Sequence, residues 1–370
     1  LIEHWGPRNK NSTNFSHMKA GVDFVNKVMN PLLKNYYYAE EQTVELPVDL
    51  LDELSRNLHN YRPQNRRFKS SISPHAIIAS NLAVVSAKCD KNYCIEIKPK
   101  EGYLAKSLNK YFKCYFCLKQ YTKLHLQQIP AVGGYCPLDL FSGNRARMKH
   151  ALSNLVDNPQ NNFKLFHDGS LVYHEKSTKE DFSKIITSTN VFDSMEIFFD
   201  FIIDVLVGDA QASDSPYDNK LKLQNKCDES NSLQKDSFLY NLLEVQKITE
   251  TINVEDIKEI NPDYVPTILE KIKNEKLNLY NENDRDTLFK VLEPTHAALI
   301  SAVAKDCSIM ISFSQDLDEN FPFLQVNKHK IVYKLSVTDL EPKSLKSVLK
   351  RIETENKMID IYHKYVGKGE

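Results

Sequence analysis

The stretch Ile95-Glu96-Ile97-Lys98-Pro99-Lys100 constrains the fold more than any other part of this chain. Side chains alternate between the two faces of a strand, so the two isoleucines would share one face and Glu96, Lys98 and Lys100 the other. The two lysines would then lie about 7 Å apart. Pro99 has no backbone N–H and keeps Lys98 extended, which ends the strand. The stretch is either an ordinary solvated strand end or a site that needs two lysines on one face.

The segments before this stretch predict helices mixed with strands. Apolar residues with a period of three to four predict a helix from Ser16 to Leu33 and a second one over Val48–Leu58. A basic loop, Tyr61–Ser73, follows. Two strand-like runs, His75–Ser86 and Asn92–Ile97, then lead into the lysines. Residues 1–100 therefore form an α+β unit in this interpretation.

Residues 101–370 are expected to be mainly helical. Ser142 should cap a helix that runs to Val156, and an Asp-Gly turn at Asp168 predicts a hairpin over 162–174. The remaining expected elements are helices over 178–208, most of 236–304, 343–353 and 356–366, and strands at Cys307–Phe313 and Lys330–Val337. Residues 209–235 are polar and poor in large apolar side chains, so we expect a surface insertion there.

Composition excludes some classes of protein. The 370 residues carry a net charge of −1, and no apolar run reaches the 18 residues that a membrane span needs. No secretory leader is visible, and seven scattered cysteines favour a reducing compartment. The ten glycines form neither of the standard phosphate-binding loops. Because the first residue is Leu1, we expect the chain to be truncated at its N-terminus.

Local charge is more informative than net charge. Between Lys98 and Leu138 there are seven lysines and a single acidic residue, Glu101. Such a segment predicts a polyanionic partner, which could be nucleic acid, anionic lipid or a small polyphosphate. The alternative is a solvated basic helix without a ligand.

Two aspartates border the late strands. Asp306 precedes the strand that begins at Cys307, and Asp339 follows the strand that ends at Val337. Carboxylates at strand ends hold Mg²⁺ in many phosphoryl-transfer enzymes. Aspartates are also common at turns, so this pattern alone leaves both interpretations open.

Taken together, six motifs resemble the inositol pentakisphosphate 2-kinase family, and its animal branch most closely. They occur in family order and cover almost the whole chain: Glu96-Ile97-Lys98-Pro99-Lys100, Cys114-Tyr115-Phe116-Cys117 with Gln120, Cys136-Pro137-Leu138-Asp139-Leu140-Phe141-Ser142-Gly143, Gln160-Asn161-Asn162-Phe163, Ala304-Lys305-Asp306-Cys307-Ser308-Ile309-Met310-Ile311, and Asp339-Leu340 with Lys343.

The resemblance implies a two-lobed, protein-kinase-like enzyme with residues 1–100 as the remainder of the N-lobe. Residues 101–370 would form an enlarged helical C-lobe. The enzyme would transfer the ATP γ-phosphate to the 2-hydroxyl of inositol 1,3,4,5,6-pentakisphosphate and give inositol hexakisphosphate, or phytate. The substrate carries about ten negative charges, which a dense set of lysines suits.

The resemblance also assigns roles to individual residues. Lys98 would touch the transferred phosphate, and Asp306 would bind Mg²⁺ and accept the 2-hydroxyl proton. Asp339 would be the main Mg²⁺ ligand and would lie, with Glu96 and the interlobe residue Asn81, on the ATP side. The residues expected to bind inositide are Arg66, Lys100, Lys123, Asn161, Asn162, Lys164, Lys343 and Arg351.

Some positions depart from the family pattern. The glycine-rich loop would lie upstream of Leu1. Plant members carry an arginine and a tyrosine where this chain has Ser347 and Arg351, and Lys119 stands where histidine is frequent. Arg351 is therefore assigned to inositide only as a replacement contact.

A zinc site is a separate expectation. Cys114, Cys117, His125 and Cys136 could form a tetrahedral Cys₃His site. A single CxxC motif on a helix is equally consistent with reduced, half-buried thiols.

Two rival functions remain at this point. A non-catalytic inositol-polyphosphate-binding scaffold would keep the lysines but would not need both aspartates. A nucleic-acid-binding module would need a second CxxC motif, which the sequence lacks. We expect a monomeric kinase of the cytoplasm and nucleus, which binds neither membranes nor nucleic acid.

Overall fold

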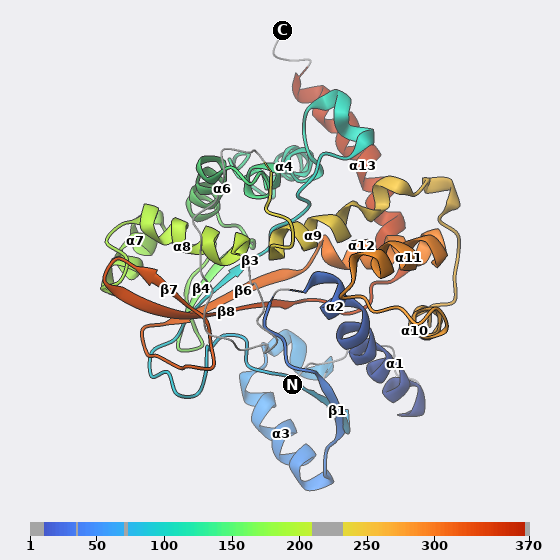
Figure 1. Ribbon diagram of the computed structural model, residues 1–370, viewed down its shortest axis with the longest axis horizontal. Coiled ribbons are helices and arrows are strands. Elements are labelled where there is room, and N and C mark those ends of the chain that lie inside the picture. Colours follow the sequence, from blue (N-terminus) through green and yellow to red (C-terminus); the bar gives the residue numbers. More distant parts are fainter. Residues whose placement is uncertain (1–10, 35, 70–72, 209–231, 367–370) are drawn as a thin grey trace.

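The computed structural model describes residues 11–34, 36–69, 73–208 and 232–366 (Figure 1). Helices and two antiparallel sheets are mixed along the chain, which confirms the α+β class. Most of the expected polar insertion, residues 209–231, lies outside the described residues. No helix in the described part of the chain has the length and apolar character needed to cross a membrane.

A six-stranded antiparallel sheet forms the centre of the molecule. Its strand order is β5-β4-β3-β6-β8-β7. The strands are β3 (Tyr93–Ile97), β4 (Phe163–His167), β5 (Ser170–Tyr173), β6 (Ser308–Ser314), β7 (Phe323–Val326) and β8 (His329–Thr338). The predicted hairpin is confirmed as β4 and β5, whose turn has positive φ at Asp168 and Gly169.

The two faces of this sheet differ in polarity because the strand sequences alternate. In β6 the isoleucines and Phe313 share one face, whereas Ser308, Ser312 and Ser314 share the other. Across the register Ile97 lies opposite Ile309, and Glu96 lies opposite Met310. One face is therefore the main core, and the other carries polar side chains although both are buried.

Helices cover the apolar face. They are α6 (Arg145–Asp157), α7 (Lys179–Ser188) and α8 (Met195–Val207), which lie together beside the sheet in Figure 1. Phe198 and Phe201 of α8 pack on Phe313 of β6 with ring centroids 6.2 and 5.3 Å away. Such aromatic pairs add about 0.5–1.5 kcal/mol each beyond burial.

The helical structure expected over 178–208 is confirmed as the two helices α7 and α8, which are separated by a break at residues 189–194. The Thr189 hydroxyl donates to the carbonyl of Ile186, and Asn190 adopts a left-handed conformation with φ of 57°. Ser194 then caps α8 by accepting from the N–H of Ile197. Short polar side chains thus bond the backbone in place of the helix.

Further helices complete the C-terminal part, and several of them lie on the opposite side of Figure 1 from α7 and α8. They are α4 (Tyr115–His125), α5 (Pro137–Leu140), α9 (Phe238–Lys247), α10 (Val265–Asn274), α11 (Glu282–Val291), α12 (Pro294–Ala304) and α13 (Leu345–Val366), with the short 3-10 turns η3 (Lys106–Tyr111), η4 (Ile248–Thr251) and η5 (Val254–Asp256). Asn144, rather than Ser142, caps α6.

The C-terminal helix α13 corrects the expectation of two helices over 343–353 and 356–366. Thr354 and Glu355 do not break it, since the Thr354 hydroxyl bonds back to the carbonyl of Lys350 and Glu355 pairs with Arg351. Its apolar face includes Val348 and Met358 and packs on α4 and α12. The apolar period continues through the middle of the helix, which is why it stays intact.

The N-terminal helix is longer than expected. It runs as α1 (Asn11–Phe24), a π turn η1 (Val25–Met29) and α2 (Asn30–Leu33). Pro31 has no N–H to donate to the preceding turn, and the Asn30 N–H instead bonds the carbonyl of Val25. The proline thus explains the wider turn.

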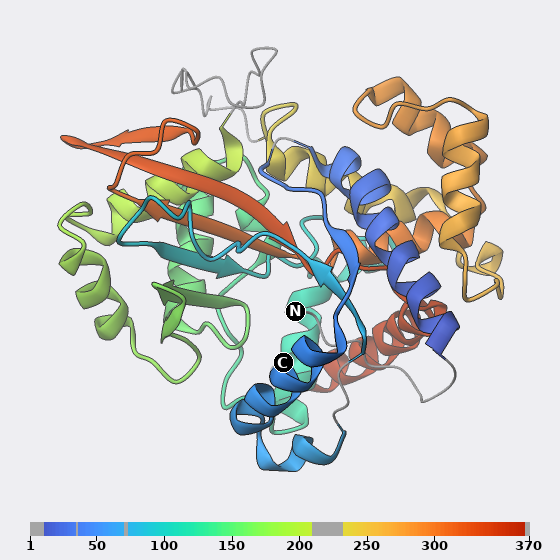
Figure 2. The same cartoon turned by 90° about the horizontal axis from the view of Figure 1, so that it is seen from below.

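A small second sheet and helix α3 (Val48–Tyr61) follow, seen below the large sheet in Figure 1 and nearest the viewer in Figure 2. The sheet pairs β1 (Gln42–Glu45), which the sequence did not predict, with β2 (His75–Ile78). The strand expected over His75–Ser86 therefore ends eight residues early. Part of the expected loop over 61–73 is the 3-10 turn η2 (Gln64–Lys69).

Antiparallel order brings four distant segments to one edge of the large sheet. β3 and β8 end there, while β4 and β6 begin there: Ile97 pairs with both Phe163 and Ile309, and Ser308 pairs with Thr338. Lys98, Asn162, Asp306 and Asp339 each lie within two residues of these strand ends. The topology thus gathers residues separated by up to 241 positions.

Candidate active site

Lys98 and Asp339 form the first part of the site. The Lys98 ammonium lies 3.0 Å from Oδ2 of Asp339, and the Ser308 hydroxyl donates to the same oxygen at 2.8 Å. Lys98 continues β3 by donating its backbone N–H to the carbonyl of Asn162. Three strands therefore fix one lysine, one carboxylate and one hydroxyl against each other.

Asp306 lies between two further lysines. Its Oδ1 is 3.5 Å from the Lys100 ammonium, and its Oδ2 is 3.2 Å from that of Lys343. The Asp306 side chain is 58% exposed, so a ligand can reach it without unfolding the site. This carboxylate therefore holds both lysines.

Electrostatics keep the two carboxylates ionised. Burial raises the pKa of Asp306, but Lys100 and Lys343 outweigh it and the net shift is downward. Burial likewise raises the pKa of Asp339, but the hydrogen bonds from Lys98 and Ser308 lower it by more, so the net shift is downward. Both groups are therefore anionic at neutral pH and available to a cation.

The lysines are perturbed in opposite directions. Burial lowers the pKa of Lys98, yet its bond to Asp339 and the fields of Glu96 and Asp306 bring the net pKa above the ordinary value. For Lys100, burial and the neighbouring Lys98 lower the pKa, and Asp306 only partly offsets this. Lys100 thus lacks enough negative charge around it, which an anionic ligand would supply.

Glu96 extends the site along the polar face of the sheet. Its Oε2 is 2.7 Å from the Lys164 ammonium of β4, and its Oε1 accepts a 3.4 Å hydrogen bond from Ser308 of β6. Glu96 and Lys98 point to the same face, as the alternation predicted. Ser308 links this pair to Asp339.

Lys123 reaches the site from helix α4. Its ammonium donates to Oε1 of Gln160 at 2.7 Å, and Gln160 in turn donates to the buried Gln120. Burial and the positive charges of Lys119 and Lys100 lower the pKa of Lys123. Asn161 is exposed and Asn162 is buried directly beside Lys98 in this loop.

Three residues of the site have left-handed backbone conformations although none is glycine. The φ angles are 61° at Lys100, 47° at Gln160 and 65° at Asp339. Such conformations cost on the order of 1–3 kcal/mol and persist only where surrounding contacts hold them. Lys100 therefore leaves the strand alternation after Pro99, which the sequence pattern did not predict.

Three assigned residues lie apart from these pairs or cannot be placed. Asn81 is in the connection after β2, where its side chain accepts from the N–H of Ala83 and its carbonyl accepts from Lys334. Arg351 of α13 is paired with the buried Glu101 and stacks over the ring of Tyr115 at 4.1 Å. The Arg66 side chain lies outside the described residues.

Sequence reasoning missed several polar partners. Ser308 contacts both Asp339 and Glu96. The serines of β6, at positions 308, 312 and 314, share one face of the strand, and this alternation could have identified Ser308. Gln160 accepts a hydrogen bond from Lys123. It was not assigned to the site, although it directly precedes the two assigned asparagines. Lys334 is buried in β8 and donates to the carbonyl of Asn81, which no local pattern indicated.

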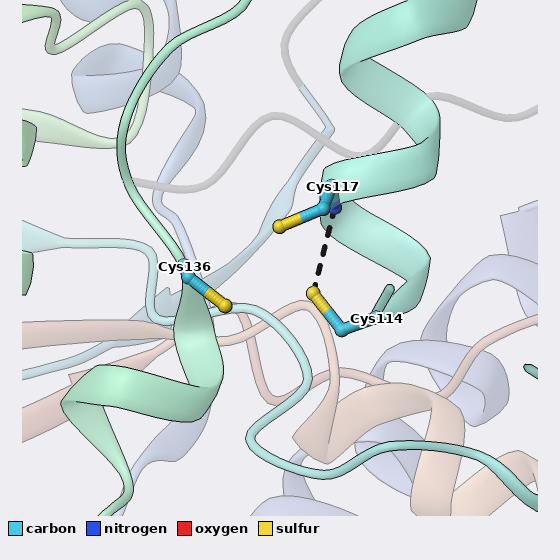
Figure 3. Close-up of side chains that lie close together, drawn as sticks. All are labelled: Cys114, Cys117 and Cys136. Carbon is cyan, nitrogen blue, oxygen red and sulfur yellow. Dashed lines mark hydrogen bonds between the residues drawn. The ribbon is translucent and has the colours of Figure 1, made fainter. Parts of the chain in front are cut away.

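The cysteines form a separate cluster, shown in Figure 3. The sulfurs of Cys114, Cys117 and Cys136 all lie within 4.8 Å of one another. Cys114 caps α4 by accepting from the N–H of Cys117 at 3.5 Å. Cys136 is the residue before α5, so two helix starts hold the three sulfurs.

His125 does not join the cysteines. It ends α4, eight residues after Cys117, which is about 12 Å further along the helix axis. Its ring lies 6.3 Å from that of Tyr365. The structure therefore gives no support for His125 as the fourth ligand of a Cys₃His site.

The three thiols are not equivalent. Hydrogen bonds from Cys114 and Cys117 lower the pKa of Cys136 to about 3, despite its burial. The contact with Cys117 lowers the pKa of Cys114, but the contact with Cys136 and burial outweigh it, and contacts with Cys114 and Cys136 raise the pKa of Cys117. Three sulfurs this close together are an arrangement that a thiophilic cation can occupy.

The main cluster combines two functions in one place. Asp306 and Asp339 can bind a hard divalent cation through oxygen. Lys98, Lys100, Lys123, Lys164 and Lys343 supply point charges for phosphate groups. Two carboxylates beside a group of lysines suit the transfer of a phosphoryl group to an anionic acceptor.

Comparisons with known proteins agree with this chemistry. The family model described as inositol-pentakisphosphate 2-kinase matches residues 3–357. The inositol-pentakisphosphate 2-kinase of Danio rerio is 27% identical over 94% of this chain and 83% of its own length. That of Arabidopsis thaliana is 27% identical over 92% and 76%. The Oryza sativa subsp. japonica protein is 28% identical over 79% of this chain and 64% of the rice protein.

Proposed function

This chain belongs to the inositol-pentakisphosphate 2-kinase family, and we propose that it transfers the γ-phosphate of ATP to the 2-hydroxyl of inositol 1,3,4,5,6-pentakisphosphate. The product is inositol hexakisphosphate. One observation supports this most strongly: Lys98 and Lys100 pair with Asp339 and Asp306 at a single edge of the sheet. A scaffold that only binds inositide would gain nothing from the two carboxylates, since they repel its ligand.

The inositide is bound by the lysines on this edge. Lys100 and Lys343 exchange Asp306 for phosphate groups when substrate arrives. Lys123, Asn161 and Asn162 contact the ring phosphates from the neighbouring loop and helix, and Lys164 does so from β4. Arg66 and Arg351 are assigned further phosphate contacts. The pKa of Lys100, lowered by burial, rises again as the substrate supplies negative charge.

The nucleotide lies toward the polar face of the sheet. Asp339 and Asp306 would hold Mg²⁺, since ionised carboxylates are the ligands this cation prefers. Bound there, Mg²⁺ would supply positive charge against the phosphates of the nucleotide. Glu96 and Asn81 lie on the ATP side, where backbone groups near Asn81 read the adenine.

Asp306 and Lys98 carry the chemical step. Asp306 accepts a hydrogen bond from the 2-hydroxyl and takes its proton late, because a carboxylate with a lowered pKa is a weak base. Lys98 stabilises charge on the phosphoryl group as it moves from nucleotide to acceptor. Positioning and charge placement therefore account for most of the acceleration.

The wider architecture follows from the same assignment. Residues 1–100 belong to an N-lobe and residues 101–370 to a C-lobe, as in two-lobed kinases. The protein acts as a monomer in the cytoplasm and nucleus and uses no membrane or nucleic acid. Light scattering of the purified protein and imaging of a tagged copy test these two points.

A structural zinc ion is a further part of the proposal. Cys114, Cys117 and Cys136 would hold it through sulfur, which fits the ligand preference of Zn²⁺. Cys114→Ser separates this role from helix capping, because serine still caps α4. We expect one equivalent of zinc in the wild-type protein and loss of it in the variant. Absence of zinc from both would reject the site.

The proposed reaction is tested with full-length protein, radiolabelled ATP and each inositol pentakisphosphate isomer in turn. We expect labelled hexakisphosphate from the 1,3,4,5,6-isomer and at least tenfold less from the others. Tight inositide binding without ATP consumption would favour the scaffold. Binding of nucleic acid in place of inositide would favour a nucleic-acid-binding module.

A further inference from the structure

A buried glutamine connects the backbone of the segment at Lys100–Gly102 with that of the segment at Ala304–Asp306. These two segments are called the catalytic segments below. Gln246 lies one residue before the end of α9 and is fully buried. Its Nε2 donates to the carbonyl of Lys100 at 2.9 Å and to the carbonyl of Ala304 at 3.0 Å. Its Oε1 accepts from the N–H of Gly102 at 2.8 Å. One side chain thus satisfies three backbone groups from two distant segments.

These two segments carry the residues that face substrate. Lys100 pairs with Asp306, and Asp306 follows Ala304 by two positions. Lys100 also has the left-handed φ of 61°. Because Gln246 bonds the Lys100 carbonyl and the N–H two residues later, it holds the chain on both sides of this conformation.

Gln246 is itself fixed from several sides. Its carbonyl accepts a 2.7 Å hydrogen bond from the buried Ser301 of α12. The ring of Phe141 lies on the other side of Gly102. A Cβ atom added at position 102 would come within 2.2 Å of this ring, so only glycine fits there. The Lys100–Gly102 segment therefore has little room to move between α9 and the segment around Phe141.

We propose that Gln246 is a positioning residue, which sets the distance between Lys100 and Asp306 through their backbones. This inference rests on the proposed function, in which those two side chains contact inositide. An amide is the side chain that fits: its nitrogen donates twice and its oxygen accepts. Gln246→Leu would leave the Lys100 carbonyl and the Gly102 N–H unpaired and the Ala304 carbonyl with only the weak Cys307 thiol donor, and Gln246→Glu would point an oxygen at two carbonyls.

The helix offers a matched control. Asn241 lies five residues earlier in α9 and is equally buried, but its amide donates to the carbonyls of Asp236 and Ser237, far in sequence from Lys100. Asn241→Leu removes a buried amide from the same helix without touching either catalytic segment. It also takes one acceptor from Arg285 of α11, so it reports the effect of destabilising α9 and its contact with α11.

The test measures inositol pentakisphosphate affinity by calorimetry, together with kcat, in the wild type and the variants. Gln246→Leu should weaken inositide binding and lower kcat by about tenfold or more each, with nucleotide affinity unchanged. Asn241→Leu should lower the melting temperature without these losses. In a Lys100→Met background, Gln246→Leu should have no further effect on inositide affinity, because it acts through Lys100.

The glutamate variant adds a second readout and serves if the leucine variant does not fold. A buried glutamate becomes protonated more readily than an exposed one, and its O–H can then donate to one carbonyl. The inositide affinity of Gln246→Glu relative to wild type should therefore rise between pH 8 and pH 6. The inference would be overturned if the affinity ratio of Gln246→Glu to wild type did not change with pH. It would also be overturned if the effects of Gln246→Leu and Lys100→Met on inositide affinity were additive, or if Asn241→Leu lost as much affinity and kcat as Gln246→Leu. A wild type that binds inositide but makes no hexakisphosphate would instead reject the proposed reaction.

Discussion

At the scale of single residues, Asp306 competes with substrate for its own lysines. Lys100 and Lys343 both pair with this carboxylate. Phosphate groups must take over these contacts before the reaction. The same carboxylate is then left to orient the acceptor hydroxyl, so its removal should affect binding and chemistry in opposite directions.

We therefore expect Asp306→Asn to lower kcat by about 10²–10⁴-fold, the range typical of lost proton-transfer groups. Inositide affinity should stay equal or become tighter, because the lysines lose their internal partner. Steady-state kinetics and calorimetry measure the two effects. A turnover number like that of the wild type would refute the role of Asp306.

The pH dependence of stability should depend on Asp339. Its pKa is lowered in the folded state by Lys98 and Ser308, in spite of burial. The unfolded chain therefore binds this proton more readily, and the stabilisation is complete above about pH 5 and lost as pH falls through the lowered pKa. Denaturant titrations at several pH values should show Asp339→Asn losing less stability than wild type below about pH 4. Parallel curves would contradict this assignment.

At the scale of elements, helix α13 is tied to the strand end by one buried ion pair. Glu101 follows Lys100 and is 7% exposed, and Arg351 of α13 is its partner. Neighbouring Glu101 raises the pKa of Arg351 although burial lowers it. The pair leaves Arg351 engaged inside the protein, whereas the family resemblance assigned it a phosphate contact.

Removing one partner of a buried ion pair typically costs about 3–5 kcal/mol, since the other charge stays unpaired. We expect Arg351→Met to lose about this much stability in urea unfolding, and the double variant with Glu101→Gln to recover most of it. Inositide affinity decides the second role. Weaker binding by the double variant would support a phosphate contact, and unchanged binding would assign Arg351 to structure alone.

Local patterns predicted some elements and not others for physical reasons. The Asp168-Gly169 turn and the alternation in Ile95–Ile97 are local signals. The hairpin of β4 and β5 and the strand β3 are present as expected. Strand β1 has only four residues and little apolar character, so it is stable only because β2 pairs with it. The partners Glu101 and Arg351 are separated by 250 positions, and no local pattern links them.

The candidate site shows the same division. Strand ends at Lys98, Asp306 and Asp339 could be found in the sequence, and the family resemblance joined them. Their pairing as Lys98–Asp339 and Lys100–Asp306 depends on strand order and on the left-handed backbone at Lys100. Neither can be read from the residues on each side of Pro99.

At the scale of the whole molecule, the small sheet of β1 and β2 and helix α3 lie on one side of the six-stranded sheet (Figure 2). The assigned inositide residue Arg66 is in η2, between α3 and β2. We propose that this unit closes on the large sheet when Arg66 contacts the inositide. We expect inositide to stabilise that arrangement.

Limited proteolysis tests the closure. Inositol pentakisphosphate should slow cleavage between residues 61 and 75, and Arg66→Ala should abolish the protection while leaving the cleavage of the free protein unchanged. ATP without inositide is the control. Equal cleavage rates with and without inositide would count against closure.

In the proposed mechanism, phosphoryl transfer takes place where Lys98 meets Asp339. The most direct measurement is the single-turnover rate of hexakisphosphate formation in wild type and in Lys98→Met, with both substrates saturating so that binding does not contribute. The rate should be at least about 100-fold lower in Lys98→Met, because the charge on the moving phosphoryl group loses its partner. An unchanged rate in Lys98→Met would contradict the proposed mechanism.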